Sequence, residues 1–169
     1  PLTPQTPMYI GSVSKSFTAL AIAQLAEQGT LDLDAPVRRY VPWFRVADPA
    51  ASAAITLRHL LHHASGLSDA GFGAVLPSDA TLEEAVRALE AARLTAPVGS
   101  KSQYFNLNYA VLGLVVEVAS GQPYADYVTA HIFAPLGMAH SYTSPEAARA
   151  NGLAQGYSRL FGFAMPRAE

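Results

Sequence analysis

The chain has 169 residues, of which 50% are hydrophobic and 14% are charged. This composition fits one domain of ordinary size with a buried core, and it excludes a disordered chain. The formal net charge is −2 with no basic run, so nothing indicates a nucleic-acid surface, and the absence of cysteine excludes disulfides and a thiol nucleophile.

The hydrophobic pattern predicts a mainly α chain. The segments that we expect to contain helices are, in chain order, residues 12–28, 31–44, 55–67, 81–94, 107–121, 122–137 and 144–152. Segment 31–44 is a turn and a short helix ended by Pro42, the helix in 55–67 stops before Gly66, and the helix in 122–137 ends near Pro135. The first and the fifth carry apolar residues on most faces, which is typical of helices inside a protein. Alternating strands are scarce, and we find no repeat and no clear domain linker.

Local signals mark several of these helix ends. Thr56 and Ser144 have the position of N-caps, and Thr81 with Glu84 matches a capping box. Between the helices that begin at Thr56 and Thr81, residues 66–80 contain glycines and no periodicity. We therefore expect a loop there that is long enough to serve a functional site.

Ser12 and Lys15 are the first candidate functional residues. They are three apart, so their side chains meet on one face of a helix. A lysine at a helix N-terminus is electrostatically disfavoured, and this field together with burial favours its neutral amine form. A neutral amine can take the proton of a neighbouring serine, and helix N-terminal amides can bind an oxyanion. An exposed lysine at a frayed helix end is the alternative.

Tyr104 and Asn106 form a second candidate pair before the helix that we expect at 107–121. A phenol can relay a proton, and an amide can contact a substrate carbonyl and a lysine at once. Two residues apart in an extended loop, the two side chains face the same side. The alternatives are a packing role for Tyr104 and an N-cap role for Asn106.

Together these motifs resemble a known superfamily. The segments "IGSVSKSFTALAIAQLAEQGTLDLDAPVRRYVP", "ITLRHLLHHASGL", "YFNLNYAVLGLVVEVASGQPY" and "IFAPLGMAHS" resemble, in that order, the serine β-lactamases and penicillin-binding proteins. The branch resembled most is that of class C β-lactamases, DD-peptidases and β-lactamase-like esterases. The resemblance implies an extracytoplasmic location, a reaction without cofactor or metal, and acyl transfer through an acyl-serine on an ester, a β-lactam or a D-Ala-D-Ala peptide.

The resemblance also implies roles for individual residues. Ser12 would be the acylated nucleophile, Lys15 the amine that activates it, and Tyr104 a helper in proton transfer. Asn106 would orient Lys15 and the substrate. Phe105 stands where serine is commoner in this branch, which would make the site more apolar and favour an esterase.

The chain departs from the family pattern in a third motif, Lys or His, any residue, then Gly, which is absent from this sequence. By resemblance, residues 1–169 form the helical lobe of an α/β (α+β) fold whose antiparallel sheet is largely missing. We expect that sheet, with a second oxyanion donor, in the rest of a longer polypeptide or in a second chain. We also expect these residues alone to associate and to lack full activity.

The sequence also suggests functions other than that of a hydrolase. His59, His62 and His63 have the i, i+3, i+4 spacing of helical metal ligands, but no acidic residue has an obvious spacing to complete a site, and the family carries structural histidines here. A catalytically silent relative that binds a ligand or a peptidoglycan-like partner, and a helical interaction module, remain open. Covalent labelling of Ser12 would separate the hydrolase from both.

Overall fold

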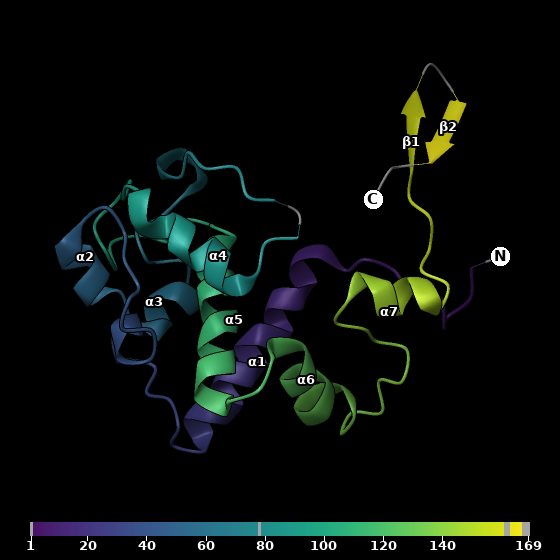
Figure 1. Ribbon diagram of the computed structural model, residues 1–169, viewed down its shortest axis with the longest axis horizontal. Helices are drawn as coiled ribbons and strands as arrows, with labels where there is room; N and C mark the ends of the chain where they lie inside the picture. The colour runs from purple at the N-terminus through teal and green to yellow at the C-terminus, as the bar shows by residue number, and fades with distance from the viewer. Residues whose placement is uncertain (1, 78, 161–162, 167–169) are drawn as a thin grey trace.

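The computed structural model describes residues 2–77, 79–160 and 163–166, and helices make up most of its regular structure (Figure 1). The helices are η1 Gly11–Val13, α1 Ser14–Glu27, η2 Val37–Arg39, α2 Pro49–Ala54, α3 Leu57–Leu61, η3 Asp69–Gly71, α4 Leu82–Arg87, η4 Ala88–Ala91, α5 Leu107–Ser120, α6 Tyr124–Val128, η5 Thr129–Phe133 and α7 Pro145–Ala150. The expectation of a mainly α chain is therefore confirmed.

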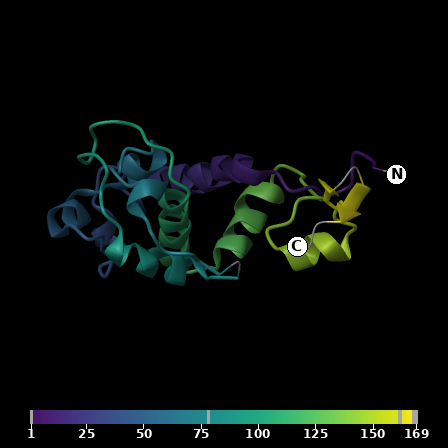
Figure 2. The same ribbon diagram turned by 90° about the horizontal axis from the view of Figure 1, so that it is seen from above.

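Helices α1 and α5 lie side by side at the centre of the molecule (Figures 1 and 2). Helix α5 also contacts α3, α4 and α6, and it buries apolar residues around most of its circumference. Helix α1 buries mainly one face, with Ile22 and Leu25 in the core, whereas Leu20 is 41% exposed, and Val13, in the turn η1 just before it, is 60% exposed. The described residues thus cover α5 more fully than α1, although the sequence pattern predicts cover for both.

The expected helix starts are confirmed by their hydrogen bonds. The Thr56 side chain accepts from the backbone N–H of His59, and Ser144 accepts from that of Ala147. At the start of α4, Thr81 accepts from the Glu84 N–H while the Glu84 carboxylate accepts from the Thr81 N–H, which is the predicted capping box.

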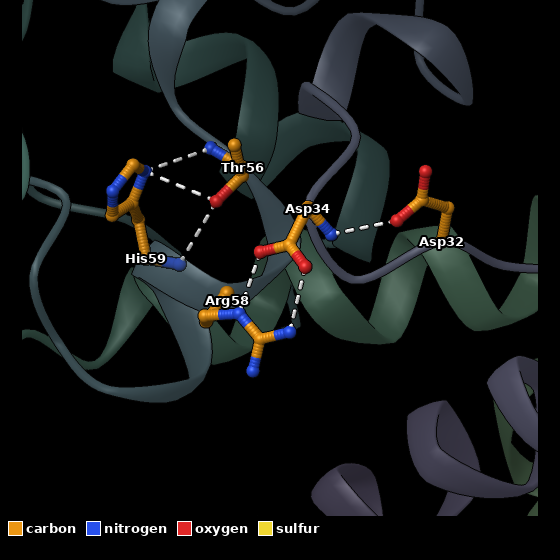
Figure 3. A network of polar contacts seen from close by, with 5 residues as sticks. All are labelled: Asp32, Asp34, Thr56, Arg58 and His59. Carbon is orange, nitrogen blue, oxygen red and sulfur yellow. Dashed lines mark hydrogen bonds and ion pairs between the residues drawn. The ribbon is translucent and has the colours of Figure 1, made fainter.

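A polar network joins α3 to the turn that follows α1 (Figure 3). Arg58 donates two hydrogen bonds to the Asp34 carboxylate, at 2.6 and 2.8 Å, and the Asp34 N–H donates to Asp32. His59 Nδ1 contacts the backbone N and hydroxyl of Thr56. The ion pair is largely exposed and so adds little stability, but its bidentate geometry fixes the position of α3.

The loop after α3 is held to the loop before α5 by backbone hydrogen bonds. The donors and acceptors are Thr95 N–H to Gly66 C=O at 2.9 Å, Gly99 N–H to Ala64 C=O at 2.8 Å, and Gln103 N–H to His63 C=O at 2.7 Å. Gly66 has a φ of 81°, and a Cβ at this position would overlap the carbonyl oxygen of Ala96. Glycine is therefore required where these two loops cross.

Three features were not expected from the sequence. Helix α2 begins after Asp48, whose carboxylate caps it. The helix predicted over 122–137 is divided into α6 and a π-helical turn, η5. Near the C-terminal end, β1 Tyr157–Leu160 pairs antiparallel with β2 Phe163–Pro166, with Tyr157 opposite Pro166, and the hairpin projects away from the helices (Figure 1).

Within the described ranges, no helix combines the length and the apolar character that crossing a bilayer would require.

Candidate active site

The candidate nucleophile lies at the very start of the central helix. Gly11, with a φ of 53°, begins the 3₁₀ turn that carries Ser12, and Lys15 follows in the first turn of α1. Ser14 is a poorer candidate for the nucleophile, because its hydroxyl already donates to the Gly11 carbonyl at 2.8 Å. Ser12 is exposed and Lys15 is half-buried, so a substrate can reach the serine while the amine stays partly shielded.

The segment before α5 brings Tyr104 and Asn106 to these two residues. The Ser12 Oγ lies 2.6 Å from the Tyr104 hydroxyl, and Lys15 Nζ donates to Ser12 Oγ at 3.2 Å. Lys15 Nζ also donates to Asn106 Oδ1 at 2.8 Å. The structure thus places all four residues predicted from the sequence in one continuous hydrogen-bonded cluster.

The alternative role of Asn106 as an N-cap is not seen. Its side chain makes no capping hydrogen bond to α5, and its backbone already has helical φ and ψ angles of −60° and −39°. An N-cap residue has non-helical angles and accepts from the first turn. The Asn106 side-chain oxygen instead accepts a hydrogen bond from Lys15, which lies on α1.

The expectation that Phe105 makes the site more apolar is corrected by the structure. Phe105 is 1% exposed and its ring meets that of Phe72 edge-on, at 5.8 Å between centroids. In extended backbone, neighbouring side chains point to opposite sides. Tyr104 therefore faces the cluster, whereas Phe105 holds the same segment in the core. Phe105 thus gives no reason to favour an esterase.

The polar partners of Lys15 are neutral. Among the described residues no carboxylate forms an ion pair with it, and Nζ lies 5.0 Å from the centroid of the Tyr104 ring and 5.8 Å from that of Tyr109. Hydrogen bonding with Lys15 and then with Ser12 lowers the pKa of the Tyr104 phenol. The amine of Lys15 and the phenol of Tyr104 thus both contact the one serine hydroxyl.

The three histidines of the metal hypothesis do not share a helix face, because α3 ends at Leu61. His59 contacts Thr56, His62 is exposed, and His63 has left the helix with a φ of 54°. The described residues contain no group of three His, Asp or Glu side chains arranged to hold a metal ion. The His63 ring instead packs at a tilt against the Tyr104 ring, at 4.6 Å between ring centroids, a position that the helical spacing did not predict.

A cavity of about 660 Å³ opens on the other side of the helix start. Its lining includes Ile10, Val13 and Phe17 from the start of the first helix, and Phe133 and Met138 from η5 and the chain that follows it. Ser12 and its polar partners do not line it, so this apolar hollow is separate from the hydrogen-bonded cluster.

Comparison with known proteins identifies a family and several relatives of this chain. The sequence model of the Beta-lactamase family matches residues 1–167. The putative penicillin-binding protein PbpX of Bacillus subtilis is 36% identical over 140 residues, which is 82% of this chain and 33% of that protein. Esterase EstB of Burkholderia gladioli is 40% identical over 153 residues, which is 82% of this chain and 38% of that protein.

A solved structure shares the fold as well. EstCE1, described as a hydrolase with promiscuous acyltransferase activity, superposes with a TM-score of 0.81 at 30% identity, covering 100% of this chain and 47% of the other. The chain therefore spans about a third of the length of the curated relatives that it matches, and about half of this structure.

Proposed function

This chain belongs to the β-lactamase family, and from that premise we propose that it carries the nucleophile of a serine hydrolase that works through a covalent acyl-serine. The observation that supports this most directly is the double contact of the Ser12 hydroxyl, with the Tyr104 phenol at 2.6 Å and the Lys15 amine at 3.2 Å. A serine hydroxyl is a weak nucleophile until a neighbouring base takes its proton.

The proposed reaction has two steps. Ser12 Oγ attacks the substrate carbonyl carbon while its proton passes to neutral Lys15 or to ionised Tyr104. The proton then goes to the leaving alcohol or amine as the carbonyl–heteroatom bond breaks. A water molecule next attacks the acyl-serine, gives one proton back through the same groups, and releases the acid and the Ser12 hydroxyl. Asn106 holds Lys15 in place throughout, by the 2.8 Å hydrogen bond.

The substrate class that we propose is an ester, a β-lactam or a D-Ala-D-Ala-type amide. The matched relatives include a penicillin-binding protein and an esterase, which supports this group of carbonyl compounds. A second candidate is a silent relative that binds such a ligand without turnover. Residues 1–169 contain no Lys/His-x-Gly motif, so the choice between the two candidates depends on a direct test of Ser12.

Covalent labelling tests the hydrolase and separates it from the silent relative. The natural polypeptide that contains these residues is treated with a fluorophosphonate and, separately, with a penicillin. We expect a stable mass increase on the peptide that contains Ser12, and its loss in Ser12→Ala. Ser16→Ala is the matched control, because Ser16 is exposed on the same helix and we expect it to label normally. Undiminished labelling of Ser12→Ala would rule out Ser12 as the nucleophile.

We also propose that the rest of the polypeptide covers the apolar side of α1. Ile10 and Val13 are 52% and 60% exposed, and they border the cavity beside the helix start. Apolar patches of this kind on soluble proteins mark interaction sites. The longer relatives have ample further chain to cover this patch and to supply a second oxyanion donor, whose loss costs about 10²–10³ in rate.

Residues 1–169 expressed alone provide the test. We expect association in solution, no cooperative thermal transition, and little hydrolysis of a chromogenic ester, whereas the longer polypeptide should be monodisperse and active. If a separately added C-terminal piece restores ester hydrolysis, the proposal is supported. If a different polypeptide restores it, that polypeptide is the one that covers the apolar side of α1. A monodisperse monomer of 1–169 with full turnover would contradict it.

A further inference from the structure

His63 lies against the back of the candidate site. Its ring packs on Tyr104 at 4.6 Å between centroids and on Tyr109 at 5.2 Å. Its Nδ1 lies 3.2 Å from the backbone N–H of Phe105, which donates to it. His63 therefore holds the residue that follows Tyr104 and also packs against Tyr104 itself.

The backbone of His63 has a left-handed conformation, which is uncommon outside glycine. Its φ of 54° is the only positive value among the non-glycine residues that the structure describes. A left-handed non-glycine residue is uncommon and costs free energy, and the surrounding structure must compensate for it. The Gln103 N–H donates to the His63 carbonyl at 2.7 Å, so this backbone is held directly to the segment that carries Tyr104.

A buried amide determines which ring nitrogen of His63 carries the proton. Asn108 is fully buried, and its Oδ1 accepts from the Ser65 hydroxyl at 2.8 Å. Its Nδ2 is then the donor that faces His63 Nδ1, at 3.3 Å. Two N–H donors, from Phe105 and Asn108, thus point at Nδ1, which must accept. The proton of neutral His63 lies on Nε2, and a proton added at Nδ1 would face both donors.

From this geometry we propose that neutral His63 is a positioning residue that holds Tyr104 against Ser12 through the Phe105 amide, and that protonation of His63 releases Tyr104 and stops acyl transfer. The kinetic part of this inference rests on the function proposed above. The tautomer and its hydrogen bonds do not, because they follow from Phe105 and Asn108 alone.

Among the charged and titratable groups around His63, Lys15 is the one whose charge opposes protonation of the ring. Lys15 approaches from α1, and the phenols of Tyr104 and Tyr109 pack on the ring from the segment before α5 and from α5 itself. Asp69, in η3, is close enough to Tyr104 to raise the phenol pKa slightly, against the larger lowering by Lys15. Burial, and then the charge of Lys15, lower the pKa of His63. The neutral form is therefore the one that the site holds at neutral pH.

Replacement of His63 by asparagine isolates the proposed role. The Oδ1 of asparagine is the same number of bonds from the backbone as Nδ1 of histidine, it accepts hydrogen bonds, and it does not titrate. Asparagine also tolerates the left-handed backbone better than most residues. His63→Asn thus keeps the acceptor and removes the proton, whereas His63→Leu removes both. His62→Asn is the matched control, because the neighbouring His62 is exposed.

The experiment measures the rate of Ser12 labelling by a fluorophosphonate between pH 4.5 and 8, in the natural polypeptide that contains these residues. The slope of log rate against pH is compared between variants. Below the pKa of His63, this slope should be greater by one in the wild type and in His62→Asn than in His63→Asn. At neutral pH, His63→Asn should stay within about tenfold of the wild type, while His63→Leu should lose about 10²-fold, the order expected when a reacting group is displaced by about 1 Å.

Selective ¹⁵N labelling of histidine gives a readout that is independent of activity. The ring of His63 should show an unprotonated Nδ1 and a protonated Nε2 at neutral pH. The opposite tautomer would overturn the inference, as would equal acid slopes in the wild type and His63→Asn, or equal losses in His63→Asn and His63→Leu. If the tautomer is as stated but Ser12 is never labelled, the proposed function fails, together with the kinetic role assigned to His63, while the hydrogen-bonded geometry stands.

Discussion

Replacing Asn106 by aspartate should shift the pH dependence of acylation without removing the site. Asn106 Oδ1 accepts from Lys15 Nζ at 2.8 Å, so Asn106→Asp places a negative charge at about that distance from the amine. Coulomb's law gives about 1.5 kcal/mol for two unit charges so placed in a medium with the dielectric constant of water, and more in a partly buried site. This attraction stabilises the ammonium form and lowers the fraction of neutral amine roughly tenfold or more.

The assay is the rate of Ser12 labelling by a fluorophosphonate across pH. At pH 7, Asn106→Asp should react about tenfold more slowly than the wild type, and its rate should recover when the pH is raised by about one unit. Asn106→Ala is the control, because it removes the acceptor without adding a charge, and its curve should not move to higher pH. A loss in Asn106→Asp that is the same at every pH would refute the role of Lys15 as a neutral base.

Three further outcomes follow from the same structure. Lys15→Arg should lose about 10²-fold in labelling rate, because arginine stays protonated; an active variant with an unchanged pH profile would mean that Lys15 only supplies charge. Gly66→Ala should cost about 2 kcal/mol or more in urea unfolding, because its φ is 81° and the new Cβ would meet the Ala96 carbonyl, whereas Gly73→Ala, which enters open space, should change little. The lowered pKa of His63 means that the unfolded chain binds more protons, so this contribution to stability is complete above about pH 6.5 and is lost as pH falls through the folded-state pKa. Unfolding curves of wild type should weaken on acidification more than those of His63→Asn; equal pH dependence would contradict this.

The helix ends were predictable from sequence because they depend on local chemistry. Thr81 and Glu84 satisfy each other's backbone groups within one turn, so four letters of sequence contain the whole signal. Helix α2 was missed although Asp48 caps it and Pro49 opens it, because the alanines and serine that follow have no apolar periodicity.

The candidate site was predictable in its members but not in its surroundings. Spacing predicts that Ser12 can meet Lys15, and that Tyr104 and Asn106 can face one side, but it was the resemblance to a known family that joined the two pairs into one site. The place of His63 depends on its own left-handed backbone, with a φ of 54°, just after α3 ends. No helical or extended period predicts such a position, and only the packed structure shows it.

The crossing of the two loops at Gly66 divides the neighbourhood of the site into a fixed part and a part that tolerates changes in length. Adding residues between 63 and 66, or between 95 and 103, would break the backbone hydrogen bonds that join them and move Tyr104 with them. Val75, by contrast, is 96% exposed on the loop that leads away from Phe72. Lengthening the chain beside Val75 costs only loop-closure entropy, about 0.6 kcal/mol for each doubling of the loop. A peptide inserted beside Val75 should therefore leave the hydrogen-bonded cluster of Ser12, Lys15 and Tyr104 in place.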